Sequence, residues 1–286
     1  GELLFRGVDA LEDIRKDSPL TLAHAKYVKA IAYAKVKTDK VDSHILAQLL
    51  RLNFIPQAHK ISNENRTLRD ALRARLKIVQ RCTSVTNSMA LLLAKYNLTE
   101  PEVLQDIPKL QFEQLSVHAS LLKEQMLTLE KSLYPYLIPN EDIQRLLWIP
   151  GIGKMNAFTI LLETDDINRF ADVKNFFSYC RLSPSARNSA GKSKQRSSKD
   201  GNKYLKIVFT DAATHAVQYY PVIRKYHNSL LRKKNKIVAK TIIAKEIAEI
   251  VYHVLKYKTN FNNKFKGVEL QHKKSLQWPR VVSPYA

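Results

Sequence analysis

The stretch Leu146-Leu147-Trp148-Ile149-Pro150-Gly151-Ile152-Gly153-Lys154 determines the fold of the second half of the chain. It separates two apolar segments of helical spacing, and its proline and two glycines interrupt a helix. The pattern therefore predicts two helices joined by a tight turn. From shape alone, two interpretations are equally good. One is an ordinary turn between helices, and the other is a helix-hairpin-helix motif, whose exposed backbone N–H groups bind a phosphate.

This glycine-containing turn does not match two other phosphate-binding motifs. A P-loop needs a glycine at the position of Trp148, ahead of the Gly-Lys pair. A dinucleotide-binding fingerprint needs a third glycine at the position of Asn156. The sequence therefore excludes a nucleotide-binding loop of either kind at this turn.

The composition favours a helical protein with a polyanionic partner. Only seven of the 286 residues are glycine, and sheets and tight turns use glycine heavily. Lys and Arg number 47 against 26 Asp and Glu, which gives a formal net charge of +21. A charge of this size points to DNA, RNA or an anionic membrane surface as the partner.

Cysteine content and hydropathy predict a reducing, cytoplasmic location. Cys82 and Cys180 are too few for a disulfide framework or a four-ligand zinc site. The start of the chain has no signal-peptide pattern, and the longest apolar runs are too short to span a bilayer. We therefore expect a soluble protein that does not contact a membrane.

The first half of the chain predicts a mixed segment followed by long helices. Residues 8–55 indicate α/β structure, with a strand at Leu20–Ala23 and a helix capped by Thr38. Residues 62–97 form one long helical pattern, in which leucines repeat at coiled-coil spacing. A helix over about 111–134 can pair back against it as an antiparallel hairpin.

Residues 141–260 predict a second, mainly helical unit around a basic loop at 183–202. The residues after Lys258 are polar and basic, and we expect them to be poorly ordered. The domain boundaries that follow from these patterns are 1–58, 59–138, 139–260 and 261–286.

Two acidic residues, Asp39 and Asp42, stand three positions apart in the first turn of a predicted helix and so share a face. Two carboxylates on one face can hold Mg²⁺, which prefers oxygen ligands. Acidic residues in a first turn also stabilise the helix dipole, and that plainer role is the more common one. From the residues alone, the plainer role is favoured.

The basic loop is the most highly charged part of the chain. From Arg181 to Lys236, 14 Lys and Arg stand against two acidic residues. Such a patch neutralises phosphates and binds nucleic acid with a strong salt dependence, although a basic loop can also be merely solvated. A serine in the loop is more often a filler than a nucleophile, because no His or Asp adjacent in sequence would activate it.

Taken together and in this order, these pieces resemble one family, the DEDD transposases of bacterial insertion sequences of the IS110 type. The segment Lys37-Thr38-Asp39-Lys40-Val41-Asp42-Ser43 is similar to the end of its N-terminal RuvC-like domain. The resemblance covers about residues 8–260. Three later segments are similar to its C-terminal transposase domain: Ile149–Phe170, Tyr179–Pro184 and Ser198–Leu205.

The resemblance implies a mainly α protein with a partial RNase H-like (RuvC-like) α/β segment, a long helical hairpin and an all-α C-terminal domain. It implies Mg²⁺ at four acidic residues, of which Asp39 and Asp42 match the third and fourth. It also implies that Ser189 attacks a DNA phosphodiester and holds the strand as a phosphoserine. The implied DNA- or RNA-binding residues are Gly151, Gly153, Lys154, Arg187, Lys192, Lys194, Arg196, Lys199, Asn202 and Lys203.

The implied partners are the DNA ends of the element and its target DNA, with a guide RNA in some members, at the bacterial nucleoid. The helical hairpin is expected to mediate homo-oligomers.

Two departures from the family pattern matter. The first Asp and the Glu of the family lie further upstream than this sequence reaches, so we expect a truncated RuvC-like segment, weakly bound Mg²⁺ and a weak or inactive site. Ala190 follows Ser189 where the family has glycine, so the nucleophile assignment can shift to Ser185 or Ser193. Two rival functions stay open: a non-enzymatic nucleic-acid-binding remnant, and a resolvase-like nuclease that uses metal and water.

Overall fold

The computed structural model describes residues 23, 28, 39–55, 58–59, 65–189, 192–197 and 200–270. The chain divides into two compact units, residues 1–63 and 64–286, and each is described by itself. Apart from Ala23 and Val28, the elements expected between residues 8 and 34 lie outside the described residues.

The first unit contains helix α3 (Asp39–Arg51), as the sequence predicts. Its buried stripe is narrow, because Leu49 is buried whereas Leu46 and Leu50 are exposed. Asp39 and Asp42 both fall in the first turn of the helix.

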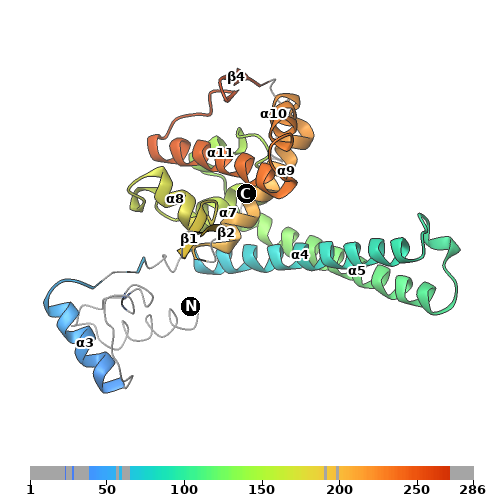
Figure 1. Ribbon diagram of the computed structural model, residues 1–286, viewed down its shortest axis with the longest axis horizontal. Helices are drawn as coiled ribbons and strands as arrows, with labels where there is room; N and C mark the ends of the chain where they lie inside the picture. Colours follow the sequence, from blue (N-terminus) through green and yellow to red (C-terminus); the bar gives the residue numbers. More distant parts are fainter. Residues whose placement is uncertain are drawn as a thin grey trace, which may run out of the picture. The chain divides into compact units, whose positions relative to one another are not determined.

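The second unit begins with a long helical hairpin formed by α4 (Arg66–Lys95) and α5 (Asp106–Leu133), which the short helix η1 (Pro101–Val103) connects. Figure 1 shows this hairpin extending from the remaining helices of the unit. Val85, Ala119 and Leu122 are buried between its two helices. Helix α5 begins at Asp106, earlier than the expected start near residue 111. The helix can include Pro108, because this residue lies in the first turn, where a backbone N–H has no partner within the helix.

Helix α7 (Lys154–Thr164) contacts α4, α6 (Glu141–Leu147) and α9 (Lys203–Tyr219), and α9 also contacts α10 (Pro221–Leu231) and α11 (Lys236–Tyr257). Ala157 and Ile160 of α7 are fully buried, as are Phe176 of α8 and Phe209 of α9. The mainly helical prediction is therefore confirmed for the described residues. The other helices are η2 (Tyr134–Tyr136), η3 (Ile167–Arg169) and α8 (Val173–Tyr179).

The expected basic loop is in fact an antiparallel β-hairpin, so the prediction of an all-α C-terminal domain is wrong at this point. Strand β1 (Pro184–Ser189) pairs with β2 (Lys192–Ser197). The strands escaped prediction because neither alternates apolar with polar residues, which is the usual signal of a half-buried strand. In the sequence, Ala190 and Gly191 separate the two strands, and both lie outside the described residues.

The predicted disorder directly after Lys258 is also wrong. Strands β3 (Lys264–Phe265) and β4 (Val268–Glu269) form a second hairpin, and Lys266 and Gly267 between them both have positive φ, as a type I′ turn requires. Phe265 is only 1% exposed and belongs to the main core together with Leu270. Phe265 and Leu270 therefore pack residues 264–270 against the core of the second unit.

The turn between α6 and α7 packs its backbone directly against α9. Gly151 has a φ of +80°, and a Cβ atom there would lie 2.0 Å from the backbone oxygen of Ala212. Gly153 is the N-cap of α7 and has no atom within 4 Å of the corresponding position. The two glycines therefore serve different purposes: one allows close packing, and the other leaves the start of α7 uncovered.

We predict that Gly151→Ala lowers the free energy of unfolding by at least about 2 kcal/mol, because both the positive φ and the contact with α9 exclude a side chain. Gly153→Ala is the matched control, and we expect it to cost less than about 1 kcal/mol, since Ala only caps a helix less well. Chemical denaturation of both variants measures the difference. Equal losses would contradict the packing argument.

Candidate nucleic-acid interface

The register of the β1–β2 hairpin gathers its charged residues on one face. Residues directly opposite each other in an antiparallel pair share a face, and so do alternate residues of one strand. Ser189 lies opposite Lys192, Arg187 opposite Lys194, and Ser185 opposite Arg196. The other face consists of Pro184, Ala186, Asn188, Ser193, Gln195 and Ser197.

This arrangement, which we call the basic face, places like charges directly across the ladder. Like charges at directly opposed positions, such as those of Arg187 and Lys194, generally destabilise a hairpin in the absence of a counter-charge. A phosphate backbone supplies such a counter-charge. Ser189 stands at the end of the same face, next to Lys192.

The two ends of the hairpin are tied together at its base. The backbone N–H of Asn202 donates to the carbonyl of Tyr179 at 2.6 Å, and Arg181 Nε donates to the carbonyl of Gly201 at 2.8 Å. Gly201 has a φ of +95°, and a Cβ atom there would lie 2.4 Å from the oxygen of Tyr179. The hairpin therefore leaves from and returns to one fixed point beside the start of α9.

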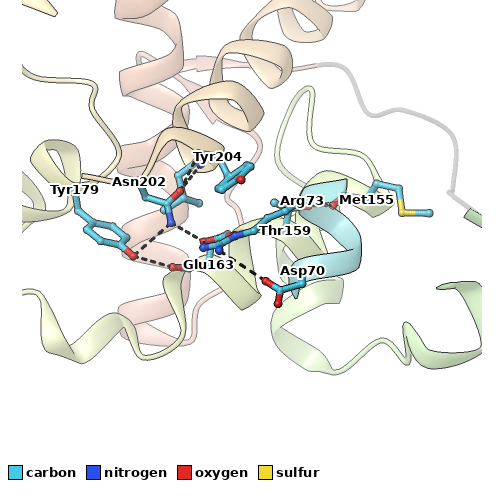
Figure 2. Close-up of polar contacts among 9 residues, drawn as sticks. Asp70, Arg73, Met155, Thr159, Glu163, Tyr179, Asn202 and Tyr204 are labelled. Carbon is cyan, nitrogen blue, oxygen red and sulfur yellow. Dashed lines mark hydrogen bonds and ion pairs between the residues drawn. The ribbon is translucent and has the colours of Figure 1, made fainter. Parts of the chain in front are cut away.

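A buried carboxylate organises the helices beneath this point, as Figure 2 shows. Both Glu163 oxygens accept hydrogen bonds from Arg73, of which Nη2 to Oε2 measures 2.8 Å, and Glu163 is fully buried. Asn202 Nδ2 donates to Glu163 Oε2 at 2.6 Å. One side chain of α7 thus joins α4 to the residue that precedes α9.

Asn202 also caps α9, because its Oδ1 accepts from the backbone N–H groups of Tyr204 at 2.9 Å and Leu205 at 3.2 Å. Arg73 lies 4.6 Å from the centre of the Tyr204 ring. The Tyr179 hydroxyl donates to the backbone oxygen of Glu163 at 3.4 Å. The base of the hairpin, the start of α9 and the helical hairpin are consequently one polar cluster.

Further positive charge surrounds the Glu163 cluster. Burial lowers the pKa of the Arg69 guanidinium below its usual value, and the neighbouring charge of Arg73 lowers it further. Arg169 stacks against the rings of Phe170 and Tyr179, at 4.3 Å and 4.4 Å from their centres. These arginines surround the Glu163 carboxylate with positive charge.

The structure separates the predicted binding residues into three groups. Gly151, Gly153 and Lys154 lie at the α6–α7 turn, where they line a cavity of about 860 Å³. Lys203 is exposed at the start of α9, whereas Asn202 is buried and its side chain serves the cap and Glu163. The third group is on the basic face, namely Arg187, Lys192, Lys194 and Arg196, and Lys199 lies outside the described residues.

The proposed metal ligands belong to the first unit. Asp39 and Asp42 are three residues apart in the first turn of α3 and therefore share a face of that helix. Carboxylates are the ligand type that Mg²⁺ prefers. Within the described part of the chain, no group of three or more His, Cys, Asp or Glu residues could hold a metal ion.

Sequence reasoning missed Glu163 and its partners. A signal was present, because Glu163 is the one charged residue between Ala157 and Thr164 in an otherwise mostly apolar helix. A lone carboxylate in such a helix is buried only with a paired cation.

None of the described helices is long and apolar enough to cross a membrane.

We predict that Glu163→Gln lowers the free energy of unfolding by about 3 kcal/mol, because Arg73 would lose its buried counter-charge and keep only the longer, partly exposed pair with Asp70 at 3.8 Å. The matched control is Glu141→Gln, which breaks the exposed pair with Arg145 and should cost less than about 1 kcal/mol. Chemical denaturation checks both values. The double variant Arg73→Met with Glu163→Gln should cost less than the sum of its parts, and strict additivity would contradict the pairing.

Two family models match the chain, and together they cover more than half of it. Residues 143–228 match the model of the IS116/IS110/IS902 transposase family, and residues 18–98 match the DEDD transposase model of the IS110 type. The second match contains Asp39 and Asp42, and the first contains the α6–α7 turn, the β1–β2 hairpin and α9.

Three relatives of known name are similar over long stretches. The transposase for insertion sequence element IS1328 of Yersinia enterocolitica is 24% identical over 79% of this chain and 75% of its own length. A Pseudomonas aeruginosa protein named as a family 20 transposase is 22% identical over 83% of this chain and 79% of its own length. A Sinorhizobium fredii protein named as a transposase, y4pF/y4sB, is 27% identical over 54% of this chain, which spans 41% of that relative. The chain belongs to the IS110-type family of insertion-sequence transposases.

Proposed function

We propose that the chain cleaves and rejoins DNA during transposition of an insertion sequence, with Ser189 as the nucleophile. The observation that carries this proposal is the hairpin register, which sets Ser189 at the end of the basic face. A nucleophile that attacks a phosphodiester must lie where the phosphate is held and its charge is balanced.

The chemistry is a transesterification. The Ser189 Oγ attacks phosphorus and forms an Oγ–P bond, while the bond from phosphorus to one bridging DNA oxygen breaks. The serine proton passes through solvent to the released DNA hydroxyl. Attack by a second DNA hydroxyl on the phosphoserine reverses these steps and joins new strands, which is the logic of covalent catalysis.

The basic face contributes charge rather than a reacting atom. Arg187, Lys192, Lys194 and Arg196 neutralise phosphates near Ser189 and stabilise the negative charge that grows on phosphate oxygens in the transition state. This supplies an activation that the immediate sequence neighbours of Ser189 lack.

Asp39 and Asp42 are the residues that would hold Mg²⁺, in a RuvC-like segment of RNase H-like fold. When bound, Mg²⁺ offsets the charge of the reacting phosphate. These two carboxylates would supply oxygen ligands to the cation, which would keep several waters.

The α6–α7 turn fits a helix-hairpin-helix site for a DNA phosphate. Gly153 caps α7 without a side-chain hydrogen bond, and open space surrounds the position of its missing Cβ. Backbone N–H groups at such a helix start attract phosphate, and Lys154 adds positive charge. An ordinary turn between helices is the competing interpretation.

Partners and organisation complete the proposal. The partners are the DNA ends of the element, the target DNA and, as in some family members, a guide RNA. The domains are residues 1–58, 59–138, 139–260 and 261–286, and the α4–α5 hairpin mediates homo-oligomers.

The central test is a covalent protein–DNA adduct. We predict that the chain forms a nuclease-resistant adduct with plasmid DNA that carries its own coding sequence and flanks, in the presence of Mg²⁺. Ser189→Ala should abolish the adduct, and mass spectrometry should find the nucleotide on Ser189. Ser193→Ala is the matched control, because Ser193 lies on the opposite face of the hairpin and should leave the adduct intact.

Three other results would overturn the assignment. An adduct that persists in Ser189→Ala and disappears in Ser185→Ala would move the nucleophile along the same face. Mg²⁺-dependent nicking that survives Ser189→Ala without any adduct would indicate the resolvase-like nuclease. Salt-sensitive binding with no cleavage under any divalent metal would indicate the non-enzymatic remnant.

The basic face also predicts a salt effect on DNA binding. Replacing Arg187 and Lys194 by Gln should reduce the slope of log K against log salt by about two, roughly one for each lost phosphate contact. Thermal stability should not fall, since the change removes a like-charge pair. Replacing the exposed Lys109 and Lys123 of α5 removes the same charge elsewhere, and an equal change in slope there would contradict a localised site.

A further inference from the structure

A cavity of about 860 Å³ lies in the second unit, beside the α6–α7 turn. One wall comes from the α4–α5 hairpin through Leu76, Val79 and Met126, and the other from α7 and α9 through Met155 and Ile207. The size is typical of sites for small organic groups, and the walls are mainly apolar with a few polar positions. We call this space the α7–α9 cavity.

Large aromatic rings border the α7–α9 cavity and remain in contact with water. Trp148 is 51% exposed and Tyr219 is 57% exposed, and both contribute to the lining. The His215 ring stacks on Tyr219, with centroids 6.1 Å apart and planes 9° from parallel. Exposed flat rings beside an apolar cavity favour a ligand that is itself flat and apolar on its faces.

One wall of the cavity carries a short row of hydrogen-bonding groups. Asn156 Nδ2 donates to Asp211 Oδ2 at 2.8 Å, and the other oxygen of Asp211 lies 3.5 Å from His215 Nε2. Asn156 is 92% buried, so its amide is held in a fixed place. A carboxylate, an amide and an imidazole in one row suit a ligand with donors and acceptors along its edge.

We propose that the α7–α9 cavity binds one unpaired nucleobase of the nucleic acid, stacked on an aromatic ring and recognised at its edge by the Asn156–Asp211–His215 row. A nucleobase combines apolar faces with a polar edge, as the lining requires. The cavity borders Gly153 and Lys154, which suits the phosphate that accompanies every base. The proposal rests on the nucleic-acid partner of the proposed function, although not on cleavage.

The base must be unpaired, because a base in a duplex has both faces stacked and its edge paired. It is either part of a single strand or rotated out of a helix, and either the DNA or an RNA can supply it. The structure therefore assigns to this cavity a preference for unpaired over paired nucleotides.

The test uses the fluorescence of Trp148. The chain has two tryptophans, so the full chain carrying Trp278→Phe reports on Trp148 alone. A mixed-sequence single strand of about 12 nucleotides should quench this fluorescence. A fully abasic strand of the same length and a duplex should bind by charge without quenching it. Equal quenching by all three, or none by any, would overturn the proposal.

A matched pair of variants locates the effect. Tyr219→Ala should weaken binding of the base-bearing strand by about fivefold to a hundredfold and leave the abasic strand unaffected. Tyr257→Ala is the control, since Tyr257 stacks on His253 at 5.7 Å on α11 in the same manner and does not line the cavity. Equal losses in both variants, or an equal loss for abasic DNA, would overturn the proposal.

Parallel titrations with DNA and RNA single strands identify which nucleic acid supplies the base. The strand that binds more tightly and quenches Trp148 fluorescence is the source, and either result supports base binding in the cavity. These measurements need no strand cleavage, so a missing Ser189 adduct leaves them intact. Conversely, normal adduct formation together with unchanged binding by Tyr219→Ala would remove the cavity proposal and leave the proposed function standing.

Discussion

The arrangement of the second unit depends on one buried ion pair, between Glu163 of α7 and Arg73 of α4. Its carboxylate also accepts from Asn202, which caps α9 and closes the base of the β1–β2 hairpin. A fully buried carboxylate is tolerated only when each of its oxygens is paired. The need to satisfy a single acidic group therefore fixes where three helices meet and where the basic face begins.

Around that fixed point, the packed helices and the basic β1–β2 hairpin have different roles. The helices beneath the hairpin are held by apolar packing of residues such as Phe176 and Phe209, whereas the hairpin contributes like charges paired across its strands. In the proposed function, this packing would hold the base of the hairpin in a fixed position. The placement of Ser189 beside Lys192, at the outer end of that surface, follows from the strand register.

The sequence predicted those elements whose signal is a repeating apolar pattern. The spacing of Leu68, Leu72 and Leu76 gave the long helix α4, and the two glycines gave the α6–α7 turn. The β1–β2 hairpin was missed because the sequence of its strands does not alternate apolar with polar residues, so that only the pairing in the structure defines it.

The candidate site was predictable only in part. Ser189, Asp39 and Asp42 came from the resemblance to a family, since nothing adjacent in sequence marks them as reactive. Glu163 and Arg73 lie 90 residues apart in the sequence, and their pairing depends on tertiary packing that no local pattern encodes. Residues before Asp39 lie mostly outside the described residues, so the expected strand there stays a prediction.

In the function that we propose, the strand register gives ionic strength two opposite effects. Arg187 and Lys194 stand at opposed positions of the hairpin, and like charges at such positions repel less when dissolved salt screens them. The same salt would compete with the phosphates of a bound nucleic acid. Salt would therefore stabilise the free hairpin and weaken its complex, so that phosphates replace dissolved ions as the screening charge at low ionic strength.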